Sequence, residues 1–516
     1  MYFEKDNFNS DYINIFKLIF FLLIFASVII QFLISEINFE LISILIIVVL
    51  SFFFLNKLII NKEVLQENFF GALIVLSLNF FYLSGPLIIK SFIFQEITSK
   101  LNMPLKSFIL AFIYQFVVIL SFSLSKKLIR KKNFNSKSIF SALRIFDFPS
   151  LKYTNLLFVI FLLIKTYIII FDYGSRSSTS YGDILMKFLY GFDMLFYLPL
   201  ILYFNLFFFK KELSKTHFFF ILFFYVFISF FQGILTNSRS IIFEGLFAIF
   251  ISYILIFAFN FNFKVKKKNI LIIILLFSLL ISLIEIISSS ILESRSIRND
   301  VTSLELLDFV IKNSDDFKLY EQDINKVDRE DYTGNNILNR FTKIKFLDKS
   351  LFESENLSIT DINLFKSFSI KKLVGIFPQN IINIFVQDYN KIYYLKHTGS
   401  YIEQLSGINF LGDLNRGSFI VELLLITDSY LYSFILIFIL YFIAFKIIKL
   451  FQKIDGKKIL FSPLILIIIY QNLYMTGSDS MFEFFNNAIR LPFQTIILYY
   501  LLILFYKKNS QIPNNQ

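Results

Sequence analysis

The segment that begins ILESRSIRND (291–300) and ends LGDLNR (411–416) is the only long polar stretch in this chain. Apolar blocks of about 20 residues flank it on both sides, which is the length that an α-helix needs to cross a bilayer. Residues 291–416 hold 16 Lys and Arg against 18 Asp and Glu, whereas the whole chain carries a formal net charge of +12. The sequence therefore predicts one large aqueous loop between two groups of membrane spans.

The composition places the chain among integral membrane proteins. Hydrophobic residues make up 56% of the 516 residues, above the 45–50% that is usual for soluble domains. The chain has no Cys, so disulfides, thiolate metal sites and cysteine nucleophiles are excluded. It has no Trp either, so an aromatic belt at the membrane interface has to be built from its 27 Tyr. The many Phe, Ile, Lys and Asn residues are typical of an AT-rich bacterial genome.

Hydropathy over windows of about 19 residues predicts an all-α, polytopic fold of about twelve transmembrane helices. The first of these we take as a retained span, because no small-residue cleavage site follows it. We divide the chain into nine spans in residues 1–290, a large periplasmic loop in 291–416, and three spans in 417–516. The expected spans are 13–35, 39–60, 69–93, 105–125, 153–172, 184–209, 216–235, 240–260, 269–290, 418–445, 458–475 and 485–506.

The distribution of basic residues predicts the orientation of these spans. Lysines are dense in the loops after the fourth, sixth, eighth and tenth spans, and they are sparse in most of the intervening loops. Short loops rich in Lys and Arg stay in the cytoplasm. We therefore expect both termini in the cytoplasm of a bacterium, the protein in its inner membrane, and the large loop on the outer, periplasmic side.

Arginine is divided unevenly between the two sides. Of ten arginines, eight fall on the outward side of this topology, and six of them flank outer span ends: Arg176, Arg239, Arg295, Arg298, Arg416 and Arg490. Guanidinium groups hold phosphate in bidentate fashion and stay charged when partly desolvated. This pattern indicates an anionic ligand at headgroup level, such as a lipid diphosphate. The alternative is that these arginines only anchor helix ends by reaching the headgroups.

Charged residues inside the apolar blocks are a second indication of a site. They are Lys165, Asp193, Glu244, Glu285 and Glu422, and all five fall in or near the outward half of the membrane. A charge in a span is costly and usually faces a cavity or a partner. We expect a polar crater that opens to the outside. Pairing between helices for structure alone is the alternative.

The large loop contains few recognisable elements. Residues 303–311 have the apolar spacing of a helix with Ser303 as its N-cap, and residues 365–394 are amphipathic enough to lie along the membrane surface. His397 lies close to Glu403 and is a candidate base. Neither a metal-ligand cluster nor a nucleotide-binding motif is found, so we expect no cofactor, metal-independent chemistry, and no nucleic-acid partner.

These features resemble the oligosaccharide repeat-unit polymerases, the Wzy-type O-antigen polymerases of the bacterial inner membrane. The match lies in the layout of about twelve spans with a large outward loop, and in the motifs GILTNSRS (233–240) and GDLNRGSFIVELL (412–424). The resemblance implies a glycosyltransferase that joins undecaprenyl-diphosphate-linked oligosaccharides on the periplasmic face and releases undecaprenyl diphosphate. It also implies a partner that regulates chain length.

The resemblance assigns roles to particular residues. Arginines of the outward loops hold the diphosphates in this family, a role that falls by position to Arg239, Arg295, Arg298 and Arg416, and less directly to Arg176. An acceptor hydroxyl needs a general base. The candidates at the crater rim are Glu403, Asp413, Glu422 and His397.

Three other functions stay open at this point. An O-antigen ligase shares the layout and the leaving group, and a catalytic histidine in the loop would favour it. A lipid-linked oligosaccharide flippase would be a transporter with two related halves and cationic spans, and it would not need so large a loop. A non-enzymatic assembly subunit would leave the outward bias of arginine unexplained.

Overall fold

The computed structural model describes residues 2–4, 8, 10–127, 143–171, 184–235, 239–259, 332–333, 338–377, 382–384, 389–391, 393–407, 417–455, 458–474 and 479–510. Within these ranges the chain is mainly helical, and nine helical segments are long and apolar enough to cross a membrane. This confirms a polytopic, helical membrane protein. The segments are Ile13–Ile34, Phe39–Leu58, Lys62–Phe92, Pro104–Lys126, Leu151–Ile168, Leu189–Lys210, Lys215–Gly233, Tyr430–Lys449 and Met481–Leu504.

The first half of the chain builds most of the bundle. Its elements are β1 (Tyr2–Glu4), α1 (Ser10–Ile34), α2 (Phe39–Leu58), α3 (Lys62–Asn79), the π-helix η2 (Phe80–Ser84), α4 (Gly85–Phe92), α5 (Pro104–Lys127), α7 (Leu151–Phe171), α8 (Ile184–Asp193), α9 (Leu198–Asn205), the π-helix η3 (Leu206–Lys210), α10 (Lys215–Leu235) and α11 (Arg239–Phe259).

The second half holds the helices of the large loop and the remaining spans. Its elements are η4 (Leu338–Phe341), α15 (Ile344–Glu355), α16 (Ile359–Val374), η5 (Tyr393–Leu395), α18 (Thr398–Leu405), α19 (Phe419–Thr427), α20 (Tyr430–Lys449), β2 (Gln452–Asp455), β3 (Lys458–Phe461), α21 (Pro463–Tyr474), α22 (Met481–Phe485), the π-helix η6 (Asn486–Arg490) and α23 (Leu491–Ser510). The helix expected at 303–311 and the span expected at 269–290 lie outside the described residues.

The span expected at 418–445 is two helices. α19 ends at Thr427 because Asp428 adopts a left-handed conformation with φ of 52°. Ser429 then takes the N-cap position of α20. Asp and Ser compete for local backbone hydrogen bonds and so favour helix ends. The membrane-spanning helix therefore starts at Tyr430, and Glu422 lies in a separate short helix before it.

The span expected at 458–475 is also shorter than predicted. Its first residues form β3, which pairs antiparallel with both β1 and β2 in a small sheet of order β1-β3-β2. Ile459 and Phe461, two residues apart, are both buried, and that spacing is the period of a strand. Only the twelve residues of α21 continue as helix. The fold is thus helical with one three-stranded sheet, which the all-α prediction did not include.

The third expected span is confirmed, although Gly85 and Pro86 interrupt its pattern. η2 widens the helix ahead of them, and α4 continues to Phe92. Lys90 is buried near its end, where its ammonium donates to Gln95 Oε1 at 3.0 Å and to Ser99 Oγ at 2.7 Å. The same ammonium lies 4.2 Å from the centre of the Tyr332 ring. Tyr332, a residue of the large loop, thus packs over Lys90 at the end of this span.

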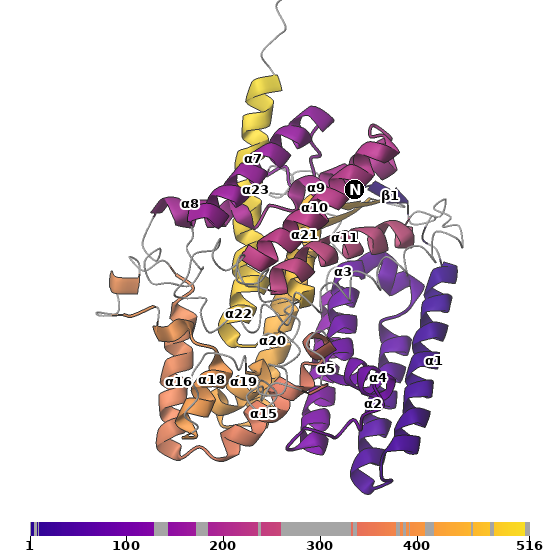
Figure 1. The fold of residues 1–516 in the computed structure, drawn as a ribbon, viewed down its shortest axis with the longest axis vertical. Coiled ribbons are helices and arrows are strands. Elements are labelled where there is room, and N and C mark those ends of the chain that lie inside the picture. The colour runs from indigo at the N-terminus through magenta and orange to yellow at the C-terminus, as the bar shows by residue number, and fades with distance from the viewer. Residues whose placement is uncertain are drawn as a thin grey trace, which may run out of the picture.

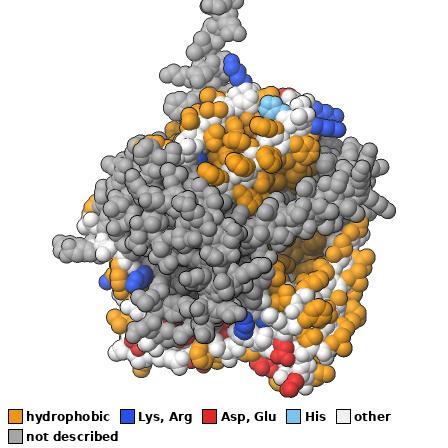
Figure 2. All heavy atoms as spheres, in the orientation of Figure 1, with side chains coloured by type: hydrophobic (Ala, Val, Ile, Leu, Met, Phe, Trp, Pro, Cys, Tyr) orange, Lys and Arg blue, Asp and Glu red, His pale blue; other side chains and the backbone are white. Residues whose placement is uncertain are grey.

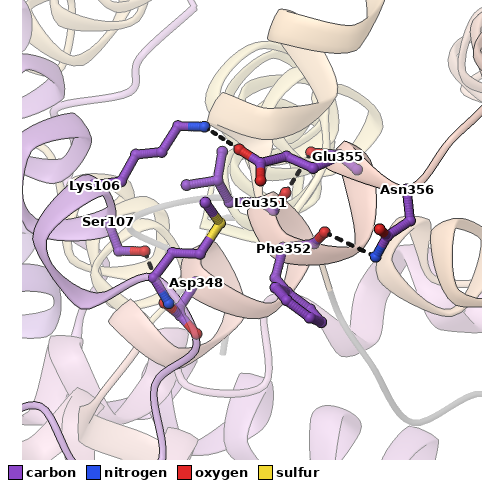
Figure 3. Close-up of polar contacts among 9 residues, drawn as sticks. Lys106, Ser107, Asp348, Leu351, Phe352, Glu355 and Asn356 are labelled. Atoms are coloured by element: carbon purple, nitrogen blue, oxygen red, sulfur yellow. Dashed lines mark hydrogen bonds and ion pairs between the residues drawn. The ribbon is translucent and has the colours of Figure 1, made fainter.

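Helix α15 of the large loop is seated on the N-terminus of α5. The buried Asp348 carboxylate accepts from the backbone amides of Asn102 at 2.7 Å and Met103 at 2.8 Å, and from the Ser107 hydroxyl at 3.0 Å. Figure 3 shows Asp348 and Ser107 facing each other, with Lys106 reaching Glu355, which lies about two turns after Asp348 on α15. Asp348 therefore joins α15 to the two residues that lead into α5 and to the first turn of α5, where the Leu105 amide donates to Glu40 instead.

These contacts place the loop helices at one end of the bundle. In Figure 1, α15, α16, α18 and α19 lie together at the lower end, whereas β1 and the end of α23 lie toward the upper end. Figure 2 shows hydrophobic side chains over much of the described surface and acidic side chains gathered at the lower right. Many of these exposed apolar residues belong to the candidate spans, as expected of helices that face lipid.

Replacing Asp348 by Ala should destabilise the protein more than replacing Glu355 by Ala. Both residues join α15 to α5, but Asp348 is buried and its loss leaves amides without acceptors, at a cost of ~2–3 kcal/mol. The Lys106–Glu355 pair is exposed, and its loss costs under ~1 kcal/mol. Thermal unfolding of the detergent-solubilised protein measures both. Equal melting temperatures for the two variants would contradict this account of the seating.

Candidate functional site

Polar side chains gather where the loop helices meet the last spans. α19 packs against α15, α16, α20 and α22, so it lies between the loop helices and the bundle. The ring of Phe419 stacks on that of Phe484, with 5.2 Å between centroids, and this fixes α19 against α22. Glu422 is one turn further along α19 and is 1% exposed. A carboxylate is therefore held at the junction of loop and bundle.

Glu422 is only half satisfied by its neighbours. Its Oε2 accepts from the backbone amide of Met481 at 2.5 Å, at the start of α22. Its Oε1 forms no hydrogen bond of good geometry with a described residue, although the Ser369 hydroxyl on α16 lies near the carboxylate. Burial raises the pKa of Glu422 to about 7, while the Met481 amide, the Lys372 ammonium and the Ser369 hydroxyl oppose that rise. Near neutral pH this carboxyl can therefore exist in either protonation state.

Three buried or half-buried lysines lie on the loop helices and the residue that precedes them, and one of these lysines is near Glu422. Lys372 on α16 lies near it and donates to the backbone oxygen of Lys396. Lys349 on α15 pairs with Glu403 on α18. Lys343 lies 3.7 Å from Asp479, measured between Nζ and Oδ1. Carboxylates thus pair with Lys343 and Lys349, and Lys372 lies near the Glu422 carboxyl, so this group of residues has no large net positive charge with which to bind an anion.

Gly417 fixes where the chain leaves the large loop and enters α19. Its φ is 86°, and a Cβ built on it would lie 2.5 Å from both the Gly399 amide nitrogen and the Thr398 hydroxyl. The Thr398 hydroxyl in turn donates to the backbone oxygen of Asp479 at 2.9 Å. The entry to α19, the start of α18 and the segment before α22 therefore meet at one point. Arg416 is the residue before Gly417 in the sequence.

A second polar group lies within the spans. Lys165 on α7 pairs with Asp193 at the end of α8, with 2.6 Å between Nζ and Oδ1, and Glu244 on α11 interacts electrostatically with both. Gly245, next to Glu244, lies so near Ser229 of α10 that a Cβ would be 2.1 Å from its hydroxyl oxygen. The structure thus brings together three of the five charges expected inside the membrane. Glu285 lies outside the described residues.

The other predicted site residues have different positions. Glu403 is buried in its ion pair with Lys349, and His397 precedes the first turn of the same helix, α18. Arg490 is exposed on η6 and donates to Asn486 Oδ1 at 3.3 Å. Arg239 is the first residue of α11, and its side chain is not described. The described ranges do not include Asp413, Arg176, Arg295, Arg298 or Arg416.

Sequence reasoning missed the lysines and the aspartate of this site. Lys343, Lys349 and Lys372 lie in the large loop, where abundant lysine looked like a consequence of composition, and Asp479 lies in the short connection before the last span. The burial of Lys372 could have been predicted from the sequence. It lies four residues after Phe368, and residues at that spacing share one face of a helix.

Among the described residues, no group of three or more His, Cys, Asp or Glu side chains is arranged to hold a metal ion. Comparison of the chain with protein-family models, with curated proteins and with solved structures finds no match.

Replacing Gly417 by Ala should disrupt the junction, whereas replacing Gly407 by Ala should be tolerated better. Both glycines have positive φ, of 86° and 83°, so both substitutions carry a similar backbone strain of ~1–2 kcal/mol. Only at Gly417 does the new methyl group also clash with backbone, since nothing lies within 4 Å of the Cβ position at Gly407. Melting temperatures and membrane protein levels of the two variants test this. A Gly417 variant as stable as the Gly407 variant would show that the contact is not needed.

Proposed function

We propose that this chain polymerises oligosaccharide repeat units carried on undecaprenyl diphosphate, as a membrane glycosyltransferase of the bacterial inner membrane. The observation that carries the proposal is Glu422, a buried carboxylate with a pKa near neutrality at the junction of loop and bundle. The motif GDLNRGSFIVELL, on which the resemblance rests, contains both this residue and Arg416.

In the proposed reaction, a hydroxyl of the acceptor sugar attacks the anomeric carbon of the donor glycan. The hydroxyl proton passes to the Glu422 carboxylate as the new C–O bond forms, and the bond between the anomeric carbon and the phosphate oxygen breaks. Undecaprenyl diphosphate departs with the negative charge. A base works best when its pKa lies near the working pH, and the pKa of Glu422 meets that condition.

The diphosphate needs positive charge that Lys343 and Lys349 do not offer, because Asp479 and Glu403 already pair with them. We assign that role to the arginines at the ends of the large loop, Arg295, Arg298 and Arg416, with Arg239. Fixed guanidinium groups stabilise the charge that develops on the leaving group. Arg416 lies two residues before the N-cap of α19, the helix that carries Glu422. In this proposal the group that holds the diphosphate and the base are therefore close together. The loop then faces the periplasm, both termini face the cytoplasm, and a separate protein regulates chain length.

Replacing Glu422 by Gln should lower the polymerisation rate ~100-fold or more, because an amide cannot take the proton. The Gln oxygen can still accept from the Met481 amide, so the junction should stay folded. The assay uses purified full-length protein in proteoliposomes with lipid-linked repeat units, and product length is read on a gel.

The matched control is Glu355→Gln, which removes an exposed carboxylate from the same group of loop helices. This variant should polymerise at the normal rate. Normal product from the Glu422 variant, at normal protein level, would remove Glu422 from the mechanism.

The pH dependence of the rate should report the charge on Glu422. The carboxyl is protonated below its pKa of about 7 and ionised above it, so the rate should rise with pH through that region. Lys372 favours the ionised form. The Lys372→Met variant should therefore shift the rise to higher pH, whereas Lys371→Met, an exposed neighbour on α16, should not. A pH profile that Lys372→Met leaves unchanged would contradict the assignment of the base.

A further inference from the structure

A groove lies between α1 and α2 at the end of the bundle opposite the loop helices. It has a volume of about 380 Å³ and is lined by three apolar residues, Leu50, Phe53 and Phe54, and by three polar ones, Lys17, Asn56 and Lys57. Such a volume is within the range of small-ligand sites. The apolar residues lie on a candidate span, so the groove opens to the hydrocarbon of the bilayer.

The position of the groove along α2 follows from contacts at the other end of that helix. Glu40, in the first turn of α2, accepts from the Leu105 amide at 3.2 Å. Two residues earlier, the Met103 amide donates to Asp348. Lys57 is 17 residues further on, which is ~26 Å along a helix. That distance is close to the thickness of the hydrocarbon core. The loop helices and the groove therefore belong to opposite faces of the membrane.

The charges of the groove favour an anionic occupant. Lys17 and Lys57 converge on it, and neither forms an ion pair with a described residue. A single lysine at such a position is explained without a bound ligand, because its apolar stem lies along the helix and its ammonium reaches the lipid headgroups. Two unpaired lysines on one apolar groove match the basic sites between membrane helices that bind anionic lipid headgroups on the cytoplasmic side.

Asn56 adds a neutral polar group to the lining of the groove. A headgroup that lies against Lys17 and Lys57 therefore also meets a side-chain amide. A headgroup that carries hydroxyls as well as a phosphate can form hydrogen bonds with such an amide.

We propose that this groove binds one anionic glycerophospholipid with a hydroxylated headgroup, of the phosphatidylglycerol type. Its phosphate contacts Lys17 and Lys57, a headgroup hydroxyl faces Asn56, and an acyl chain lies along Leu50, Phe53 and Phe54. This site is separate from the Glu422 site and does not depend on the function proposed for it.

The absence of Trp from the chain gives a direct test. In Leu50→Trp the only indole of the protein lies in the groove, and brominated lipids quench it when they bind beside it. The full-length protein is reconstituted in vesicles of phosphatidylcholine with increasing brominated phosphatidylglycerol, and in parallel with brominated phosphatidylcholine. We expect phosphatidylglycerol to quench with a binding constant several-fold higher than phosphatidylcholine, and that preference to weaken as salt is raised.

Two controls keep the test decisive. Adding Lys17→Gln and Lys57→Gln to the reporter should reduce the preference to about one. A reporter at Ile439→Trp, an exposed apolar position of α20 outside the groove, should show no preference. Phe53→Trp repeats the measurement should Leu50→Trp fold poorly. Equal quenching by the two lipids at the groove, or a preference that survives the loss of both lysines, would overturn the proposal.

Discussion

The rest of the structure depends on the seating of the loop helix α15 on the N-terminus of α5, through the buried carboxylate of Asp348. Backbone amides where a chain enters a helix have no partners within the helix, and at a membrane surface they cannot be left buried and unpaired. Asp348 accepts from the amides of Asn102 and Met103, the two residues that precede α5, although it lies about 245 residues away in the sequence. The loop is thereby fixed to the bundle, and α15 can then hold α18 through the Lys349–Glu403 ion pair.

The position of the site depends on this contact between α15 and α5, through the helices that pack next to α15. α18 packs against the point where the chain enters α19, and Gly417 allows the backbones to approach there. α19 is then set between the loop helices and α22, where Glu422 meets the Met481 amide. The pKa of Glu422 is raised by this burial more than it is lowered by the Lys372 ammonium. The chemical property that we assign to the site is thus a consequence of packing several helices around one carboxylate.

Part of this arrangement could be predicted from the sequence, and the physical reasons for the rest are specific. Hydropathy located the early spans because long apolar helices are set by bilayer thickness. It missed the break at Asp428 and the strand β3, because a window of about 19 residues averages over a two-residue helix end and a four-residue strand. Glu422 was among four candidate bases. Lys349 and Lys372 were not predicted, since their roles come from contacts between helices that periodicity does not reveal.

The most direct measurement of the central claim is a gel of surface glycan from cells in which the gene for this protein is deleted. The account predicts that the ladder of long polymers disappears and that lipid A core capped by a single repeat unit remains. An unchanged ladder would contradict polymerisation. Bare core with lipid-linked repeat units accumulating in the membrane would also contradict it, and would show that transfer to the core or translocation is the step that this chain performs.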